Sequence, residues 1–185
     1  MVAYVGLDKI RAIKLELKIP SAGKSNTLSI GEKWNLEVFV DKAAWIYCYY
    51  YFANTKDPEN NKTIMFYPNP STWSIYKTPK IPPQKIISIP RSNHSKDKQK
   101  GSVSFTTSPP TGAELVKCFA SQRDITKDLP EELRGKEQTK TKNKTNSIPP
   151  LPDQLGAMLP DIFLRVDPMI SESSLLITVI EAHLR

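Results

Sequence analysis

KWNLEVFVDKAAWIYCYYYFA, residues 33–53, is the stretch of this sequence that decides its fold. In its first half, apolar side chains at positions 34, 36, 38 and 40 alternate with the mostly polar side chains at positions 33, 35, 37 and 39. Such alternation turns one face of a strand to the core and leaves the other mostly to solvent. Residues 45–52 are almost wholly aromatic and apolar, which is typical of a central strand buried on both faces. The stretch therefore predicts a β core.

Strand patterns also occur before and after this stretch, and helices are few. We predict strands over residues 13–19, 28–30, 63–67, 86–89, 103–107, 114–121 and 174–180. Residues 128–134 are expected to form one helical turn and residues 153–159 a short helix that Pro160 ends or restarts. Because regular strand–helix alternation is missing, we expect a mainly β fold, an antiparallel β-sandwich with one or two short helices. The chain of 185 residues is expected to be one such domain, residues 1–185, with long polar loops.

The period-two pattern also predicts which side chains share the core and where one strand ends. The expected core members are Trp34, Leu36, Val38, Ile46, Cys48, Tyr50, Phe52 and Val116. The strand over residues 63–67 should stop at Pro68, because proline lacks the ladder N–H group. Asn69 is expected to organise the turn that follows.

The charge balance is basic, with a net charge of +7 and a sequence pI of about 9.3. Such an excess raises the possibility of nucleic-acid or anionic-membrane binding. Much of it lies in two polar stretches, RSNHSKDKQK at 91–100 and RGKEQTKTKNK at 134–144. Neither stretch interleaves aromatic residues with its cations, so we expect solvated, mobile loops near 91–101 and 135–148. Nucleic-acid binding is therefore not expected.

The sequence alone does not decide the cellular compartment of the protein. No segment approaches the roughly 18 apolar residues that span a bilayer, and residues 1–9 lack the apolar core of a signal peptide. We expect a periplasmic or cell-envelope location if a leader was trimmed, and a cytoplasmic one otherwise. Cys48 and Cys118 both lie in apolar strand-like runs, where buried free thiols are the default expectation. A single bridge in an oxidising compartment is the alternative.

Motifs for catalysis or cofactor binding are weak. Gly23-Lys24-Ser25 resembles the tail of a phosphate loop, but the required earlier glycine is missing and a strand follows instead of a helix. His94, His183 and the two cysteines lack the paired spacing of a zinc site, and a Cys–His nucleophilic pair is only formally possible. We therefore expect a non-enzymatic protein with no catalytic residue, no cofactor and no bound metal.

One aromatic row is the candidate for a partner surface. Trp45, Tyr47, Tyr49 and Tyr51 lie at alternate positions and so share one face of their strand. Tyrosine and tryptophan are favoured at interfaces, because they combine a large apolar area with a polar tip. The alternative is that this face packs in the core or under a covering loop.

Four segments together resemble the bacterial domain-of-unknown-function family 4384. The segments are SIGE at 29–32 leading into a strand, the aromatic strand 44–52, IMFYPN at 64–69, and PPTGAE at 109–114 with the strand 116–121. The resemblance covers roughly residues 28–123, and its most specific element is the F/Y-P-N motif. This sequence departs from the family in the long 71–100 insertion and the lysine-rich 138–146 loop.

The resemblance implies an immunoglobulin-like β-sandwich without catalytic residues and a role in binding other proteins. From it we expect a non-catalytic binding or assembly module in a bacterium, an accessory part of an envelope or secretion-associated complex. The alternative is a cytosolic accessory or effector domain that binds a partner, such as an acidic one, through its basic loops.

Overall fold

The computed structural model describes residues 12–52, 62–68, 80–90, 104–133 and 153–182, which form a mainly β structure. The strands are β1 (Leu15–Lys18), β2 (Thr27–Ser29), β3 (Lys33–Trp34), β4 (Leu36–Val40), β5 (Ala44–Phe52), β6 (Lys62–Tyr67), β7 (Lys80–Ile81), β8 (Lys85–Ile89), β9 (Phe105–Thr106), β10 (Gly112–Ser121) and β11 (Ser171–Ile180). The helical elements among these residues are the 3-10 turns η1 (Pro20–Ser25) and η4 (Glu131–Leu133) and the helix α1 (Asp153–Val166).

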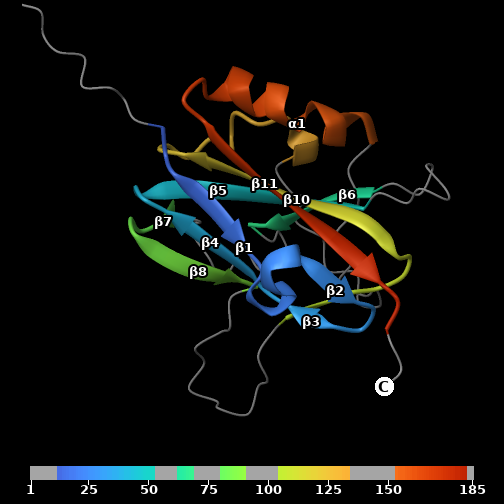
Figure 1. Cartoon of the computed structure of the whole chain (residues 1–185). Helices are drawn as coiled ribbons and strands as arrows, with labels where there is room; N and C mark the ends of the chain where they lie inside the picture. The colour runs from blue at the N-terminus through green and yellow to red at the C-terminus, as the bar shows by residue number, and fades with distance from the viewer. Residues whose placement is uncertain (1–11, 53–61, 69–79, 91–103, 134–152, 183–185) are drawn as a thin grey trace, which may run out of the picture.

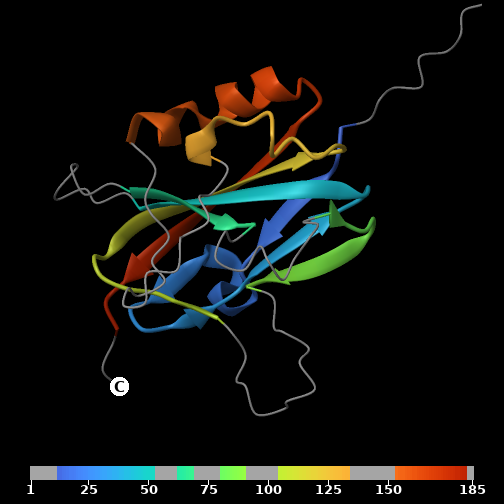
Figure 2. The same cartoon turned by 180° about the vertical axis from the view of Figure 1, so that it is seen from behind.

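The strands form a β-sandwich with a helix on its outside. The order β2-β11-β10-β5-β6 makes the large sheet, with β7 also pairing with β5, and β1-β4-β8 makes the sheet that faces it. The short strands β3 and β9 pair with each other in a separate two-stranded sheet. Figures 1 and 2 show α1 lying along the outer face of the large sheet, on the side away from β4 and β8. All described pairings are antiparallel except that of β11 with β2. The predicted β-sandwich is confirmed.

The core between the two sheets contains the side chains that the period-two pattern predicts. Leu36 and Val38 of β4 and Ile46 and Cys48 of β5 have no exposed surface, and Val116 of β10 is equally buried. Trp34 and Tyr50 belong to the same cluster. The expected core is therefore confirmed for these seven residues, while the side chain of Phe52 lies outside the described part.

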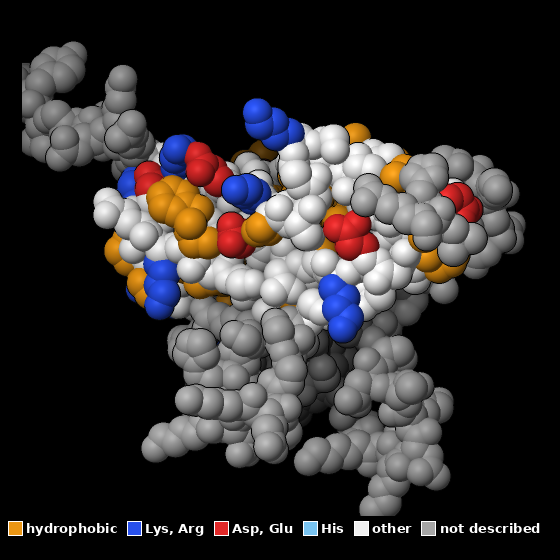
Figure 3. Space-filling view, turned by 60° about the horizontal axis from the view of Figure 1, so that its bottom comes forward, with side chains coloured by type: hydrophobic (Ala, Val, Ile, Leu, Met, Phe, Trp, Pro, Cys, Tyr) orange, Lys and Arg blue, Asp and Glu red, His pale blue; other side chains and the backbone are white. Residues whose placement is uncertain are grey.

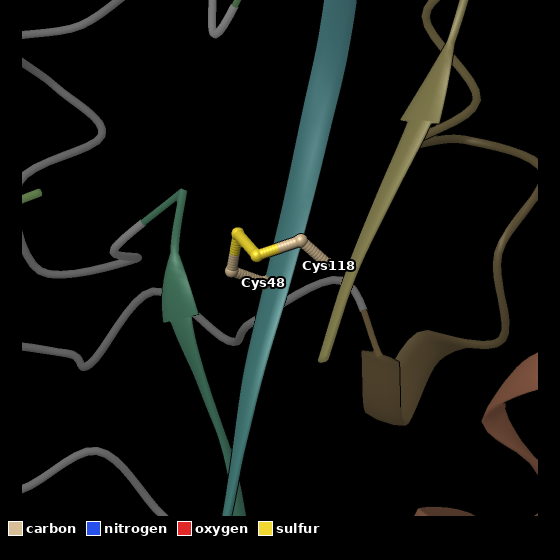
Figure 4. Close-up of a disulfide and its surroundings, with 2 residues drawn as sticks. All are labelled: Cys48 and Cys118. Carbon is tan, nitrogen blue, oxygen red and sulfur yellow. A yellow bond between two sulfur atoms is a disulfide. The ribbon is translucent and has the colours of Figure 1, made fainter. Parts of the chain in front are cut away.

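The cysteines correct the expectation of free thiols. Cys48 and Cys118 form a disulfide between β5 and β10, and Figure 4 shows the sulfur atoms bridging the two strands. The two residues are direct register partners, with 4.1 Å between their Cα atoms. Adjacent strands can place facing Cβ atoms within bonding reach. Separate strand patterns could not reveal this register, so the sequence left the bridge as the alternative.

The structure tests the predicted bounds of one strand, one helix and one helical turn. The strand β6 ends at Tyr67, directly before Pro68, as predicted. Pro160 does not end the C-terminal helix, because α1 continues through it to Val166. The turn predicted at residues 128–134 appears as the shorter η4. Asn69, His94, His183 and the loops near 91–101 and 135–148 lie outside the described residues.

Candidate functional site

The aromatic row on β5 that was predicted as a partner surface is buried at its centre and half-buried at its two ends. Tyr47 and Tyr49 are buried beneath α1, at 0% and 1% exposure. Trp45 and Tyr51, at the two ends of the row, are half-buried. The covering element is thus a helix on the outer sheet face, so only the ends of the row remain open to a partner. The partner surface stays a prediction for Trp45 and Tyr51.

Burial of the two central tyrosines is accompanied by hydrogen bonds for both hydroxyl groups. The Tyr47 hydroxyl accepts a hydrogen bond from the Ile125 backbone N–H at 3.1 Å and donates to Asp124 Oδ1 at 3.1 Å. Tyr49 donates to the Leu133 carbonyl oxygen at 3.4 Å. Burial raises the pKa of Tyr47 to about 12 and raises that of Tyr49 further. These groups are packed and neutral, so their role is to hold residues 124–133, which include η4, against the sheet.

A second core lies between α1 and the large sheet. The rings of Phe119 and Phe163 stack in parallel, with centroids 4.0 Å apart, and the Tyr49 ring packs edge-on against both. Phe163 comes from α1 and Phe119 from β10, so these contacts fix the helix to the sheet. Aromatic pairs of this kind stabilise a fold beyond the area they bury.

A groove runs beside α1 on this outer face. It has a volume of about 200 Å³ and is lined mainly by Tyr49, Tyr51, Leu115, Lys117, Gly156 and Leu159. Gly156 permits the close approach, because a Cβ atom there would collide with the Oγ1 atom of Thr63 on β6. We call this space the outer groove.

An apolar row extends the outer groove across three strands. Leu115 of β10 is the register partner of both Tyr51 on β5 and Leu176 on β11, so the three side chains share the outer sheet face. Leu176 is 59% exposed. Lys117 lies next on this face of β10 and is paired with Glu172 at 2.8 Å. The outer groove therefore joins an exposed apolar row to a polar edge, the arrangement typical of binding surfaces.

A second cavity, of about 120 Å³, lies at another place on the sandwich. Its walls include the rings of Trp34, Tyr50, Phe66 and Phe105, and we call it the aromatic pocket. Neighbouring rings pack against one another, with centroid distances of 5.7 Å for Trp34–Tyr50, 4.7 Å for Trp34–Phe105, 5.4 Å for Phe66–Phe105 and 6.4 Å for Tyr50–Phe66. The four rings therefore form a closed circuit.

Glu114 supplies a carboxyl group to the aromatic pocket. It is 5% exposed, and its Oε2 atom accepts a hydrogen bond from the Tyr50 hydroxyl. Burial raises the pKa of Glu114, although the Tyr50 hydrogen bond acts in the opposite direction. Among the described residues no cation pairs with this carboxyl group. The aromatic pocket was not predicted from the sequence, because there Glu114 is only a polar residue at the start of a predicted strand.

A cluster of hydrogen bonds around Ser121 has a structural role. Ser121 donates to Asp167 at 2.6 Å and accepts from the Arg123 backbone N–H at 3.1 Å. This cluster joins the end of β10 to the connection between α1 and β11.

Both cysteine sulfurs are held in the disulfide, so neither is a thiolate that could serve as a nucleophile. Within the described ranges, no three His, Cys, Asp or Glu side chains are placed to hold a metal ion.

The basic excess of the chain lies largely outside the described part. Acidic and basic side chains are close to balance among the described residues, while the net charge of the whole chain is +7. Figure 3 shows cationic and anionic side chains interspersed on the described surface of one face. No described helix is long and apolar enough to cross a membrane.

No protein-family model, no curated protein and no solved structure matches this chain. The likeness to family 4384 therefore stays a prediction from sequence motifs.

Proposed function

We propose that this protein is a non-catalytic binding or assembly module that contacts a partner protein at the outer groove. The observation that carries the proposal is the apolar row Tyr51–Leu115–Leu176 beside the groove. Leu176, at one end of the row, is 59% exposed. An apolar row open to solvent beside a cavity offers a partner area to bury without rearrangement.

The setting that we propose is an envelope or secretion-associated complex of a bacterium, in which this chain is an accessory part. The Cys48–Cys118 disulfide supports an oxidising compartment, because structural disulfides persist there and are rare in the cytosol. The bacterial setting rests on the family resemblance alone. Together, the two support our proposal of a periplasmic or envelope location.

The alternative is a cytosolic accessory or effector domain that binds a partner through its basic loops. Its support is the uneven charge, since the basic excess lies outside the near-neutral sandwich. Such a contact would weaken steeply with salt, whereas an apolar contact at the outer groove would not. Salt dependence therefore separates the two candidates.

Site-specific photocrosslinking in bacterial cells tests the proposal. A photoreactive amino acid is placed at Leu176, and a matched control is placed at Ile86, which is 58% exposed on β8 of the other sheet. We expect a discrete crosslinked protein from position 176 and none from position 86. A partner identified in this way should bind the purified chain, and Leu176→Asp should weaken that binding at least tenfold.

Two results would contradict the proposal. One is equal crosslinking from both positions, which would indicate nonspecific contact. The other is a partner whose binding survives Leu176→Asp but is lost in high salt, which would favour the basic-loop alternative. Thiol trapping in the same cells tests the compartment, since an oxidised pair should resist alkylation until it is reduced.

A further inference from the structure

We propose that the aromatic pocket is a binding site for a quaternary ammonium group. The four rings of Trp34, Tyr50, Phe66 and Phe105 line it together, and the buried carboxyl group of Glu114 lies in its wall. This inference goes beyond the proposed function, because it concerns another face of the chain and a different ligand.

The rings give the pocket its affinity for a cation. Each aromatic face carries negative electrostatic potential, so a cation within about 6 Å of several ring centroids is attracted by all of them. The ring-to-ring distances of 4.7–6.4 Å show that the walls lie close together. Trp34 and Phe105 are register partners on β3 and β9, while Tyr50 and Phe66 come from the neighbouring strands β5 and β6. Strand pairing therefore sets the positions of the walls in advance.

Glu114 gives the pocket its charge preference. A buried carboxylate is costly unless a cation or hydrogen bonds compensate for the lost water. Among the described side chains, Tyr50 supplies one hydrogen bond and none supplies a positive charge. A bound cation would supply the missing charge.

The choice of a quaternary over a primary ammonium follows from hydrogen-bonding capacity. A primary ammonium has three N–H donors, and aromatic walls leave such donors without acceptors. One carboxylate oxygen of Glu114 is already engaged by Tyr50. A quaternary ammonium has no donor to satisfy and sheds its water more easily. The hydroxyls of Thr106 and Ser108, both exposed residues at the rim, can receive a polar group attached to it.

Calorimetric titration of the full chain tests the proposal with choline and its neutral isostere, 3,3-dimethyl-1-butanol. The two have nearly the same shape and differ in charge. We expect choline to bind at least about tenfold more tightly than the isostere. Methylammonium serves as the primary-amine probe and is expected to bind more weakly than choline.

The diagnostic variant is Glu114→Gln, which keeps the side-chain shape and the ability to accept from Tyr50. It should weaken choline binding about tenfold while the thermal midpoint stays the same or rises, because an uncompensated buried charge has been removed. Glu181→Gln, an exposed residue just after β11, is the matched control and should change neither. Phe105→Leu should also weaken choline binding, since it retains apolar volume and removes one ring.

Four results would overturn the inference. They are no binding of choline, equal binding of choline and its isostere, tighter binding of methylammonium, and a Glu114→Gln variant that binds choline like the parent chain. Each of these leaves crosslinking at Leu176 untouched, so failure here is distinguishable from failure of the partner proposal.

Discussion

Cys48 and Cys118 lie directly opposite each other on neighbouring strands, although 70 residues separate them in the sequence. Their sulfur atoms are bonded in the core between the two sheets, and neither residue has exposed surface. The bridge therefore ties together β5 and β10, the two adjacent strands at the centre of the large sheet. It closes a long loop of chain that contains β6, β7, β8 and β9.

Removal of the disulfide should lower stability markedly. The double variant Cys48→Ala/Cys118→Ala should lose about 2–5 kcal/mol of unfolding free energy, because a closed loop of this length restricts the unfolded chain. Denaturant titration measures the loss. Reductant should destabilise the parent chain and leave the double variant unaffected. A parent chain that unfolds identically with and without reductant would show that the bridge adds nothing.

Leu36 tests the core between the sheets. It has no exposed surface, so Leu36→Ala should cost about 2–5 kcal/mol through lost burial and the cavity that remains. Ile86→Ala, at a position that is 58% exposed, is the control and should change unfolding free energy far less. Urea titration of the two variants compares them. Similar losses at both positions would mean that burial does not govern stability here.

The sandwich core was predictable because strand periodicity is a local signal. Alternation in residues 33–40 and the apolar run after Ala44 set the buried faces of β4 and β5 without knowledge of their neighbours. The short strand β7 was missed, since two residues carry too little pattern to detect. Pairing order was also beyond reach, because register depends on contacts between segments distant in sequence. The disulfide could not be predicted for the same reason, because it depends on the register between β5 and β10.

The sites were harder to predict than the fold for a related reason. The aromatic row on β5 was found, but the helix that covers Tyr47 and Tyr49 lies more than 100 residues further along the chain. The aromatic pocket draws its walls from β3, β5, β6, β9 and β10, so no single stretch contains its pattern. The hydrogen bond between Glu114 and Tyr50 joins β10 to β5, so it becomes visible only when the strands are aligned.

Gly156 tests how closely α1 docks. In an isolated helix, Gly→Ala stabilises by about 1 kcal/mol, since alanine is the better helix former. Here the new methyl group would collide with Thr63 Oγ1, so Gly156→Ala should instead destabilise by about 1–3 kcal/mol. The paired variant Gly156→Ala/Thr63→Ala should recover part of that loss, and a double-mutant cycle on unfolding free energy measures the coupling. Strict additivity would indicate that the two residues do not touch.

Glu114 should give the protein a distinctive dependence of stability on pH. Burial raises the pKa of Glu114 above its ordinary value of 4.5, and Tyr50 is the other titratable group that contacts it. The folded state therefore favours the protonated carboxyl group. As pH rises from about 4.5 through the raised folded value, the unfolded chain releases this proton first, so the free energy of unfolding falls. Glu114→Gln cannot release a proton and should not show this fall. Thermal midpoints of both chains across this pH range should converge at the acid end and diverge toward neutral pH, with the variant higher. Parallel curves would show that Glu114 titrates alike in the folded and unfolded states.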